Sequence, residues 1–335
     1  MTRQSIRLNV KTVFWNGNEK RFRALWRLLG MASLTGIILL TLLMLMGILF
    51  SVSNSTLELE PFDLNQIPFN IQFIATFISA GSVLVGILLS CKIIDHRRFA
   101  DLGFHLNQNW WIDFGFGLLL GAVLMAAIFL VELTAGWITI NGIFVTNTET
   151  SFLFSLLQNL ILFLFVGVYE ETITRGYLLL NLAEGLHLPH LSAKQTILLA
   201  WFFSSLVFGS LHAGNPHASI ISTLNLVLAG LFLGLGYVLT GELAISIGLH
   251  ITWNFFQGNV FGFPVSGTTP AATVVAVQQG GQEFLTGGRF GPEAGLIGIA
   301  AILLGSLLIY IWVRRKTGKA SLQERLTIYP KVASS

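Results

Sequence analysis

The sequence contains little charge and almost no cysteine. Only 10% of its 335 residues are Asp, Glu, Lys or Arg, whereas soluble globular proteins carry about 25%. The single cysteine, Cys91, excludes a secreted domain held together by disulfides, and the sequence has no polar low-complexity tract of the kind that keeps a chain disordered. Apolar residues are abundant instead, since 53% of the chain is hydrophobic. With a mean hydropathy of +0.73, this composition predicts a membrane protein.

The apolar residues gather in stretches long enough to cross a bilayer. A transmembrane helix needs roughly 20 mostly apolar residues, and eight stretches meet this requirement. We therefore predict an all-α fold, a polytopic membrane helix bundle with about eight transmembrane helices. The expected helices span Met31–Val52, Ile71–Ile94, Ile112–Leu133, Phe152–Leu180, Thr196–His212, Ala218–Thr240, Leu243–Phe263 and Ala294–Val313.

The cations are unevenly distributed along the chain. Sixteen of the 19 lysines and arginines lie in the segments 1–30, 92–111 and 314–335. Loops rich in Lys and Arg stay on the cytoplasmic side of a membrane. Eight crossings then place both termini in the cytoplasm and the Gly-, Thr- and Gln-rich loop 264–293 outside. We expect an integral protein of a bacterial plasma membrane, whose basic patches contact lipid head groups rather than nucleic acid.

Ionisable residues interrupt the fourth apolar stretch. Such groups are costly at membrane depth and mark functional sites there. Glu171 and Arg175 are i,i+4 neighbours on a helix and can form an ion pair. Glu170 is rotated by about 100° and lacks that partner, so it can serve as a general acid or base. The alternative is that the cluster lies at the membrane interface and has no catalytic role.

Two further apolar stretches carry histidines. His212 ends the fifth stretch, and His250 shares a helix face with Asn254 in the seventh because the two residues are four apart. A histidine can accept a proton, and an asparagine amide can donate to a developing oxyanion. Glu170, His212 and His250 also form a donor set that suits a divalent metal such as zinc. The usual His-Glu-x-x-His zinc signature is absent, so we favour direct activation of water, with a divalent metal such as zinc as the alternative.

The order of these motifs is specific. The sequence reads Glu-Glu-x-x-x-Arg, then Phe-x-x-x-His, then His-x-x-x-Asn along successive membrane stretches. It resembles the CPBP family of intramembrane metalloproteases, which contains the type II CAAX prenyl endopeptidases and the Abi or bacteriocin-immunity proteins. The resemblance covers about residues 151–260, and the segment 99–104 is similar to one that precedes the core in this family.

The resemblance implies a hydrolase and a role for each residue. Glu170 with His212 would activate the attacking water, and His250 with Asn254 would stabilise the oxyanion. Glu171 and Arg175 would support the site. The implied substrate is a membrane protein or a lipidated peptide in the bilayer.

The resemblance also divides the chain and leaves two other functions open. We expect a basic cytoplasmic segment, three transmembrane helices, a protease-like catalytic core, an extracytoplasmic loop, and a last helix with a basic tail, at 1–30, 31–150, 151–263, 264–293 and 294–335. Intramembrane Glu and His residues also serve transporters and proton relays. A catalytically silent immunity or scaffold protein of the same fold is the third reading.

One geometric requirement accompanies the catalytic reading. If the fourth and fifth stretches crossed the membrane vertically, Glu170 and His212 would lie near opposite faces, about 20 Å apart at 1.5 Å per residue. For the site to assemble, the fourth helix must be long and tilted, or the fifth must end inside the membrane.

Overall fold

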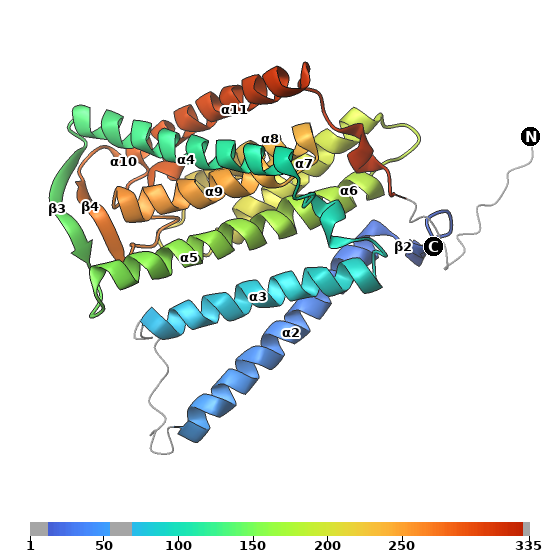
Figure 1. Cartoon of the computed structure of the whole chain (residues 1–335), viewed down its shortest axis with the longest axis horizontal. Coiled ribbons are helices and arrows are strands. Elements are labelled where there is room, and N and C mark those ends of the chain that lie inside the picture. Colours follow the sequence, from blue (N-terminus) through green and yellow to red (C-terminus); the bar gives the residue numbers. More distant parts are fainter. Residues whose placement is uncertain (1–12, 54–68, 331–335) are drawn as a thin grey trace, which may run out of the picture.

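The computed structural model describes residues 13–53 and 69–330 and confirms a polytopic helical bundle. Within these residues, seven helical stretches are long and apolar enough to cross a membrane. They are built from α2 (Ala24–Ser53), α3 (Phe69–Ile93), α4 (Gln108–Thr134), α5 (Phe152–Glu171) with its extension, α7 (Ala193–Leu211), α8 (Ile220–Thr240) and α11 (Leu296–Thr317). The helices lie side by side, and α2 splays away from the rest (Figure 1).

The helix that contains the two glutamates is unusually long. From α5 the chain continues through the π-helical segment η3 (Thr172–Leu179) into α6 (Leu180–Gly185), giving one apolar helix of 34 residues. At 1.5 Å per residue it measures about 51 Å, well beyond the roughly 30 Å of a hydrocarbon core. Glu170 therefore lies near the middle of the helix, not at its end. The fourth helix is therefore long, as the first geometric solution requires, while its tilt and the depth at which the fifth helix ends stay predictions.

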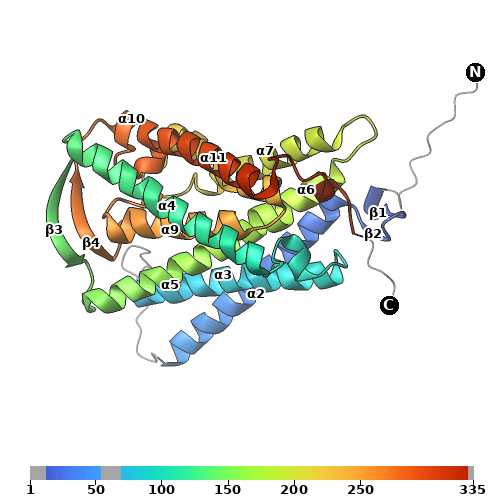
Figure 2. The ribbon, with the colours of Figure 1, turned by 45° about the horizontal axis from the view of Figure 1, so that its top comes forward.

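The seventh predicted span, Leu243–Phe263, is corrected by the structure. It forms a shorter helix, α9 (Ala244–Phe255), followed by the π-helical segment η4 (Phe256–Val260). Most of α9 is buried, and it packs against α4, α5 and α8. The stretch is apolar because it lies at the centre of the bundle, where it is surrounded by other helices rather than by lipid. It appears at the core of the bundle in both ribbon views (Figures 1 and 2).

The predicted loop 264–293 contains regular structure. Its strand β4 (Ala272–Gln279) pairs antiparallel with β3 (Ile138–Thr146), with a register irregularity between Ile140 and Gly142. The short helices α10 (Glu283–Thr286) and η5 (Pro292–Ala294) follow before α11. The β3–β4 ribbon covers one end of the bundle (Figure 1).

The N- and C-terminal described segments meet at the opposite end of the bundle. The small hairpin β1 (Trp15–Asn16) and β2 (Arg21–Phe22) lies there, as do η2 (Phe99–Leu102) and η6 (Glu324–Thr327). Arg21, in the hairpin, is fully buried and pairs with Glu184 in α6 at 2.8 Å. Tyr329 donates from its hydroxyl to the carbonyl of Asp95, just beyond α3, at 3.0 Å. Both described ends therefore share one side of the bundle, and their cytoplasmic location stays a prediction.

Candidate active site

The two glutamates stand where α5 changes into a π-helix. Behind them, Thr172 donates its hydroxyl to the carbonyl of Val168 at 2.6 Å, and Thr174 bonds in the same way to the carbonyl of Glu170. Such bonds from threonine back to the preceding turn accompany bent or widened helices. Single π-helical turns inside α-helices are frequent at functional sites. The widened turn directly follows the residues that the sequence marked for chemistry.

Glu171 holds the site together from behind. Its side chain is fully buried, and its Oε1 accepts a bond from Arg175 Nη1 at 2.9 Å, which is the i,i+4 pair that the spacing predicts. The same oxygen accepts from His250 Nδ1 at 2.8 Å. Arg175 in turn donates to the carbonyl of Gly230 in α8 at 2.8 Å, and its guanidinium lies 4.5 Å from the centre of the Phe208 ring. One buried ion pair therefore links four helices.

This arrangement orients the imidazole of His250. Its Nδ1 faces the carboxylate of Glu171, which is paired with the guanidinium of Arg175 and accepts the hydrogen bond, so Nδ1 carries the proton in that bond. The other nitrogen, Nε2, is then directed at Glu170, whose Oε2 lies 3.9 Å away. A carboxylate that fixes one imidazole nitrogen so that the other meets the reacting groups is the logic of hydrolase triads.

Glu170 keeps one oxygen available. Its Oε1 accepts a bond from the hydroxyl of Tyr169 at 3.0 Å. Its Oε2 is buried and has no hydrogen-bond partner among the residues that the structure describes. A buried carboxylate oxygen without a partner is costly, and such an atom is expected to serve a catalytic purpose or to bind an ordered water.

His212 approaches from another helix. It is the C-terminal cap of α7, and its Nδ1 donates to the carbonyl of Phe208 at 2.8 Å. Because a carbonyl can only accept, the neutral ring has its lone pair on Nε2. The Phe208 ring lies between the two histidines, with its centre 4.8 Å from the His212 ring and 6.1 Å from the His250 ring.

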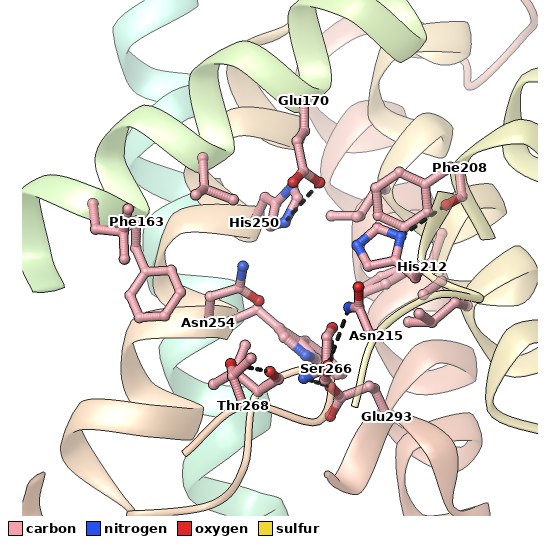
Figure 3. Close-up of a pocket in the computed structure, with 18 of the residues that line it drawn as sticks. Phe163, Glu170, Phe208, His212, Asn215, His250, Asn254, Ser266, Thr268 and Glu293 are labelled. Carbon is pink, nitrogen blue, oxygen red and sulfur yellow. Dashed lines mark hydrogen bonds and ion pairs between the residues drawn. The ribbon is translucent and has the colours of Figure 1, made fainter. Parts of the chain in front are cut away.

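The four side chains share one cavity. It has a volume of about 230 Å³ and is lined by Glu170, His212, His250 and Asn254 together with apolar residues of α5 and α8. Figure 3 shows them arranged around the same space, with Asn254 one turn beyond His250 on α9. Glu171 and Arg175 lie behind this group. The structure thus brings all six predicted residues into one site, and their individual roles remain predictions.

Besides Thr76 of α3, four further polar residues line the cavity and were not predicted. They are Asn215, Ser266, Thr268 and Glu293, from the loop after α7 and from the 264–293 segment. Three of them are far from the sequence motifs, and only the tertiary fold places them at the site. Glu293 had one recognisable signal, because it is an acidic residue next to a long apolar stretch.

The arrangement of donors does not fit a metal centre. Within residues 13–53 and 69–330, no group of three or more His, Cys, Asp or Glu side chains is close enough to hold an ion. We derive no catalytic step through a metal.

A comparison with known protein families identifies the segment that contains the predicted site residues. Residues 152–256 match the family model described as type II CAAX prenyl endopeptidase, Rce1-like. The chain carries an Rce1-like domain. The matched segment begins at α5, ends within η4, and contains all six predicted site residues, so the resemblance to the CPBP family is confirmed. No curated protein and no solved structure matches the chain. The Rce1-like match stops before the 264–293 segment, which contributes Ser266, Thr268 and Glu293 to the cavity.

Proposed function

We propose that the protein is an intramembrane endopeptidase that hydrolyses peptide bonds of membrane-associated or lipidated protein substrates. One observation carries the proposal: the free oxygen of Glu170 meets a cavity that it shares with His212, His250 and Asn254. Peptide hydrolysis needs an activated water and a donor set for the oxyanion, and this cavity offers residues for both. The Rce1-like match supports the class of reaction.

The first step is activation of water. A water molecule between Glu170 and Nε2 of His212 loses a proton to the free oxygen of Glu170 while its own oxygen bonds to the substrate carbonyl carbon. The electrons of the C=O double bond move to the carbonyl oxygen, giving a tetrahedral oxyanion. The low polarity of the surrounding helices strengthens each of these interactions relative to water.

The second step is stabilisation and collapse of the oxyanion. Asn254 donates from its amide, and His250 donates from Nε2 when it is protonated. Glu171 holds the ring in that orientation because its carboxylate accepts the hydrogen bond of Nδ1 at 2.8 Å. Collapse breaks the C–N bond, and the proton held by Glu170 passes to the leaving nitrogen. Glu171 and Arg175 thus act through His250 without touching the substrate.

A change of Glu170 to Gln tests the proposal. It preserves the shape of the side chain and removes the base, so cleavage of a reporter membrane protein in liposomes should fall at least ~10²-fold. Glu283→Gln, an exposed carboxylate in α10, is the matched control and should cleave normally. Cleavage by the Glu170→Gln protein at the wild-type rate would reject the mechanism.

A proton relay is the second candidate function. The hydrogen-bonded series from Arg175 through Glu171 to His250, with Glu170 beyond it, is also an arrangement that moves protons in transporters. The same liposomes distinguish the two functions. Proton uptake that depends on an imposed ion gradient and is lost in Glu170→Gln, without any peptide cleavage, would favour the relay.

A further inference from the structure

A tight turn forms one wall of the cavity. Val265 and Thr268 exchange two backbone hydrogen bonds of 2.9 Å each, so that Ser266 and Gly267 are the central residues of a two-residue hairpin. Both have positive φ, 47° for Ser266 and 86° for Gly267. Such mirror-image turns suit glycine, whereas a serine in this region is uncommon. The neighbouring structure must therefore hold Ser266 in place.

Three anchors hold the turn. Asn215 donates from its amide to the carbonyl of Ser266 at 3.1 Å, and the backbone amide of Gly267 donates to the carbonyl of Phe290 at 2.7 Å. The backbone amide of Ser266 donates to Oε1 of Glu293 at 2.7 Å. These anchors belong to different loops, and two of them follow the turn by more than 20 residues.

Glu293 is an unusual anchor because it is a buried carboxyl group without a cation. It is 4% exposed, and its second oxygen accepts a hydrogen bond from Gln257. In the part of the chain that the structure describes, no Lys, Arg or His forms an ion pair with it. Burial raises the pKa of Glu293 to about 7. The charged or titratable groups that share its cavity are Glu170, His212 and His250, while α8 contributes apolar residues only.

The turn faces the catalytic group across the cavity. Ser266 and Thr268 line the same space as Glu170 and His212, and Figure 3 shows Ser266, Thr268 and Glu293 on the side opposite Glu170. The cavity of about 230 Å³ is too small for more than one or two side chains beside the scissile bond. A polypeptide that reaches Glu170 must then touch the turn.

We propose that the Val265–Thr268 turn is a substrate-contacting wall of the active site and that Glu293 is the residue that positions it. The substrate contact rests on the proposed peptidase function, whereas the positioning does not. The backbone amides of the turn are all engaged, but the hydroxyl oxygens of Ser266 and Thr268 can still accept hydrogen bonds, and the cavity lining from α8 is apolar. This asymmetry fits a peptide with a small or polar residue toward the turn and an apolar residue toward α8.

Cysteine labelling tests the positioning without any assay of activity. Val265→Cys supplies a thiol on the turn at a position that is only 8% exposed, and the only native cysteine, Cys91, is also buried. A water-soluble maleimide should label Val265→Cys in full-length protein in liposomes at least tenfold faster when Glu293→Ala is added. Adding Glu283→Ala should leave the rate unchanged. Equal rates in all three proteins would overturn the positioning role.

The amide variant keeps the test valid if Glu293→Ala does not fold. Glu293→Gln retains an acceptor oxygen for the Ser266 amide but cannot ionise. Raising the pH from 6 to 8 speeds the labelling of any cysteine, because the thiolate is the reactive form. The acceleration should be greater in Val265→Cys than in Val265→Cys with Glu293→Gln, because an ionised Glu293 draws water toward itself and loosens the turn. An identical pH response in both proteins would contradict the proposal.

Cleavage of paired peptides tests the substrate contact. With wild-type protein, we expect a preference for Ser over Leu at one position beside the scissile bond. Glu293→Ala should lower kcat/KM about tenfold and reduce that preference, whereas Glu283→Ala should change neither. An unchanged preference in Glu293→Ala rejects the contact. If the wild type cleaves no peptide, the proposed function fails together with the contact, and the labelling rates still decide the positioning role.

Discussion

At the scale of single residues, Glu170 and Glu171 differ only in direction. Glu171 lies against Arg175 and His250, and its side chain has no exposed surface. Glu170 faces the cavity, and 17% of its side chain is exposed. The rotation of about 100° between consecutive helical residues separates their environments completely. Carboxylates that are adjacent in the sequence therefore have different surroundings in the site, and we expect different roles for them.

Removing the buried carboxylate should destabilise the protein. Glu171→Gln leaves Arg175 charged and unpaired, and Arg175→Ala does the same to Glu171; breaking a buried pair from one side costs roughly 3–5 kcal/mol. Both variants should lower the unfolding temperature in detergent, and Glu170→Gln should not. The assignment is reversed if Glu171→Gln is stable but inert while Glu170→Gln is stable and active.

The carboxyl group of Glu293 should make stability depend on pH. Burial raises the pKa of Glu293 from 4.5 to about 7, so its stabilising contribution is fully present below pH 4.5. As the pH rises above 4.5, the carboxyl group of Glu293 ionises first in the unfolded chain, and the stabilising contribution falls steadily. The loss is complete once Glu293 also ionises in the folded protein, near pH 7. The loss is at most about 3 kcal/mol.

Thermal unfolding of wild type and Glu293→Gln between pH 4 and pH 8 measures this loss. The wild type should lose stability across that range by more than the variant does, because a glutamine cannot ionise. Parallel curves would show that Glu293 does not ionise in this range.

At the scale of elements, the close packing of α4 on α9 positions two site residues. A Cβ atom on Gly117 would lie 2.5 Å from the carbonyl oxygen of Ile245, and one on Gly121 would lie 2.6 Å from that of Leu249. Both contacts are closer than real Cβ atoms allow. Since α9 carries His250 and Asn254, the glycines at positions 117 and 121 of α4 allow the close helix packing that positions these two residues.

A methyl group at this interface should therefore disturb both folding and activity. Gly117→Ala should cost about 1–3 kcal/mol of stability and should lower cleavage, because α9 must move. Gly115→Ala, two residues earlier on α4 with nothing within 4 Å of its Cβ position, is the control and should behave as wild type. Unfolding temperature and reporter cleavage provide the two readouts.

The sequence predicted the positions of the helices better than it predicted which residues or lipids surround each helix. Hydropathy located the membrane helices, since each needs a long apolar stretch whatever its neighbours are. It could not distinguish lipid from protein as the apolar environment, so it did not show that α9 is enclosed by other helices. The six motif residues follow from spacing within single helices. Ser266 and Glu293, 27 residues apart, meet through loop folding, and no local pattern encodes that contact.

At the scale of the whole molecule, the placement of the ends agrees with the uneven distribution of cations. Arg21 and Arg97 both pair with Glu184 at the end of the long helix, at 2.8 and 2.7 Å. The ring of Tyr329 lies 3.5 Å from the guanidinium carbon of Arg21. The first and last described segments are thus joined at one end, and the β3–β4 ribbon covers the other.

Labelling of introduced cysteines tests the predicted orientation. Asn18, Lys319 and Gln278 are exposed, the first two at the joined end and the third in the ribbon. In intact cells, an impermeant maleimide should label Gln278→Cys and should not label Asn18→Cys or Lys319→Cys. Labelling of Asn18→Cys and Lys319→Cys but not of Gln278→Cys would place the described ends outside and would reverse the predicted orientation.

The 34-residue helix has one more consequence, for the lipid around the protein. The second half of this helix, η3 and α6, is mostly buried in the protein, so α5 is the part that must match the hydrocarbon layer. Its 20 residues measure about 30 Å, the thickness of an ordinary layer, and Glu170 stands where this part ends. A thinner or thicker bilayer should tilt the helix or deform around it, and the change in depth of Glu170 should make the proposed turnover depend on lipid composition.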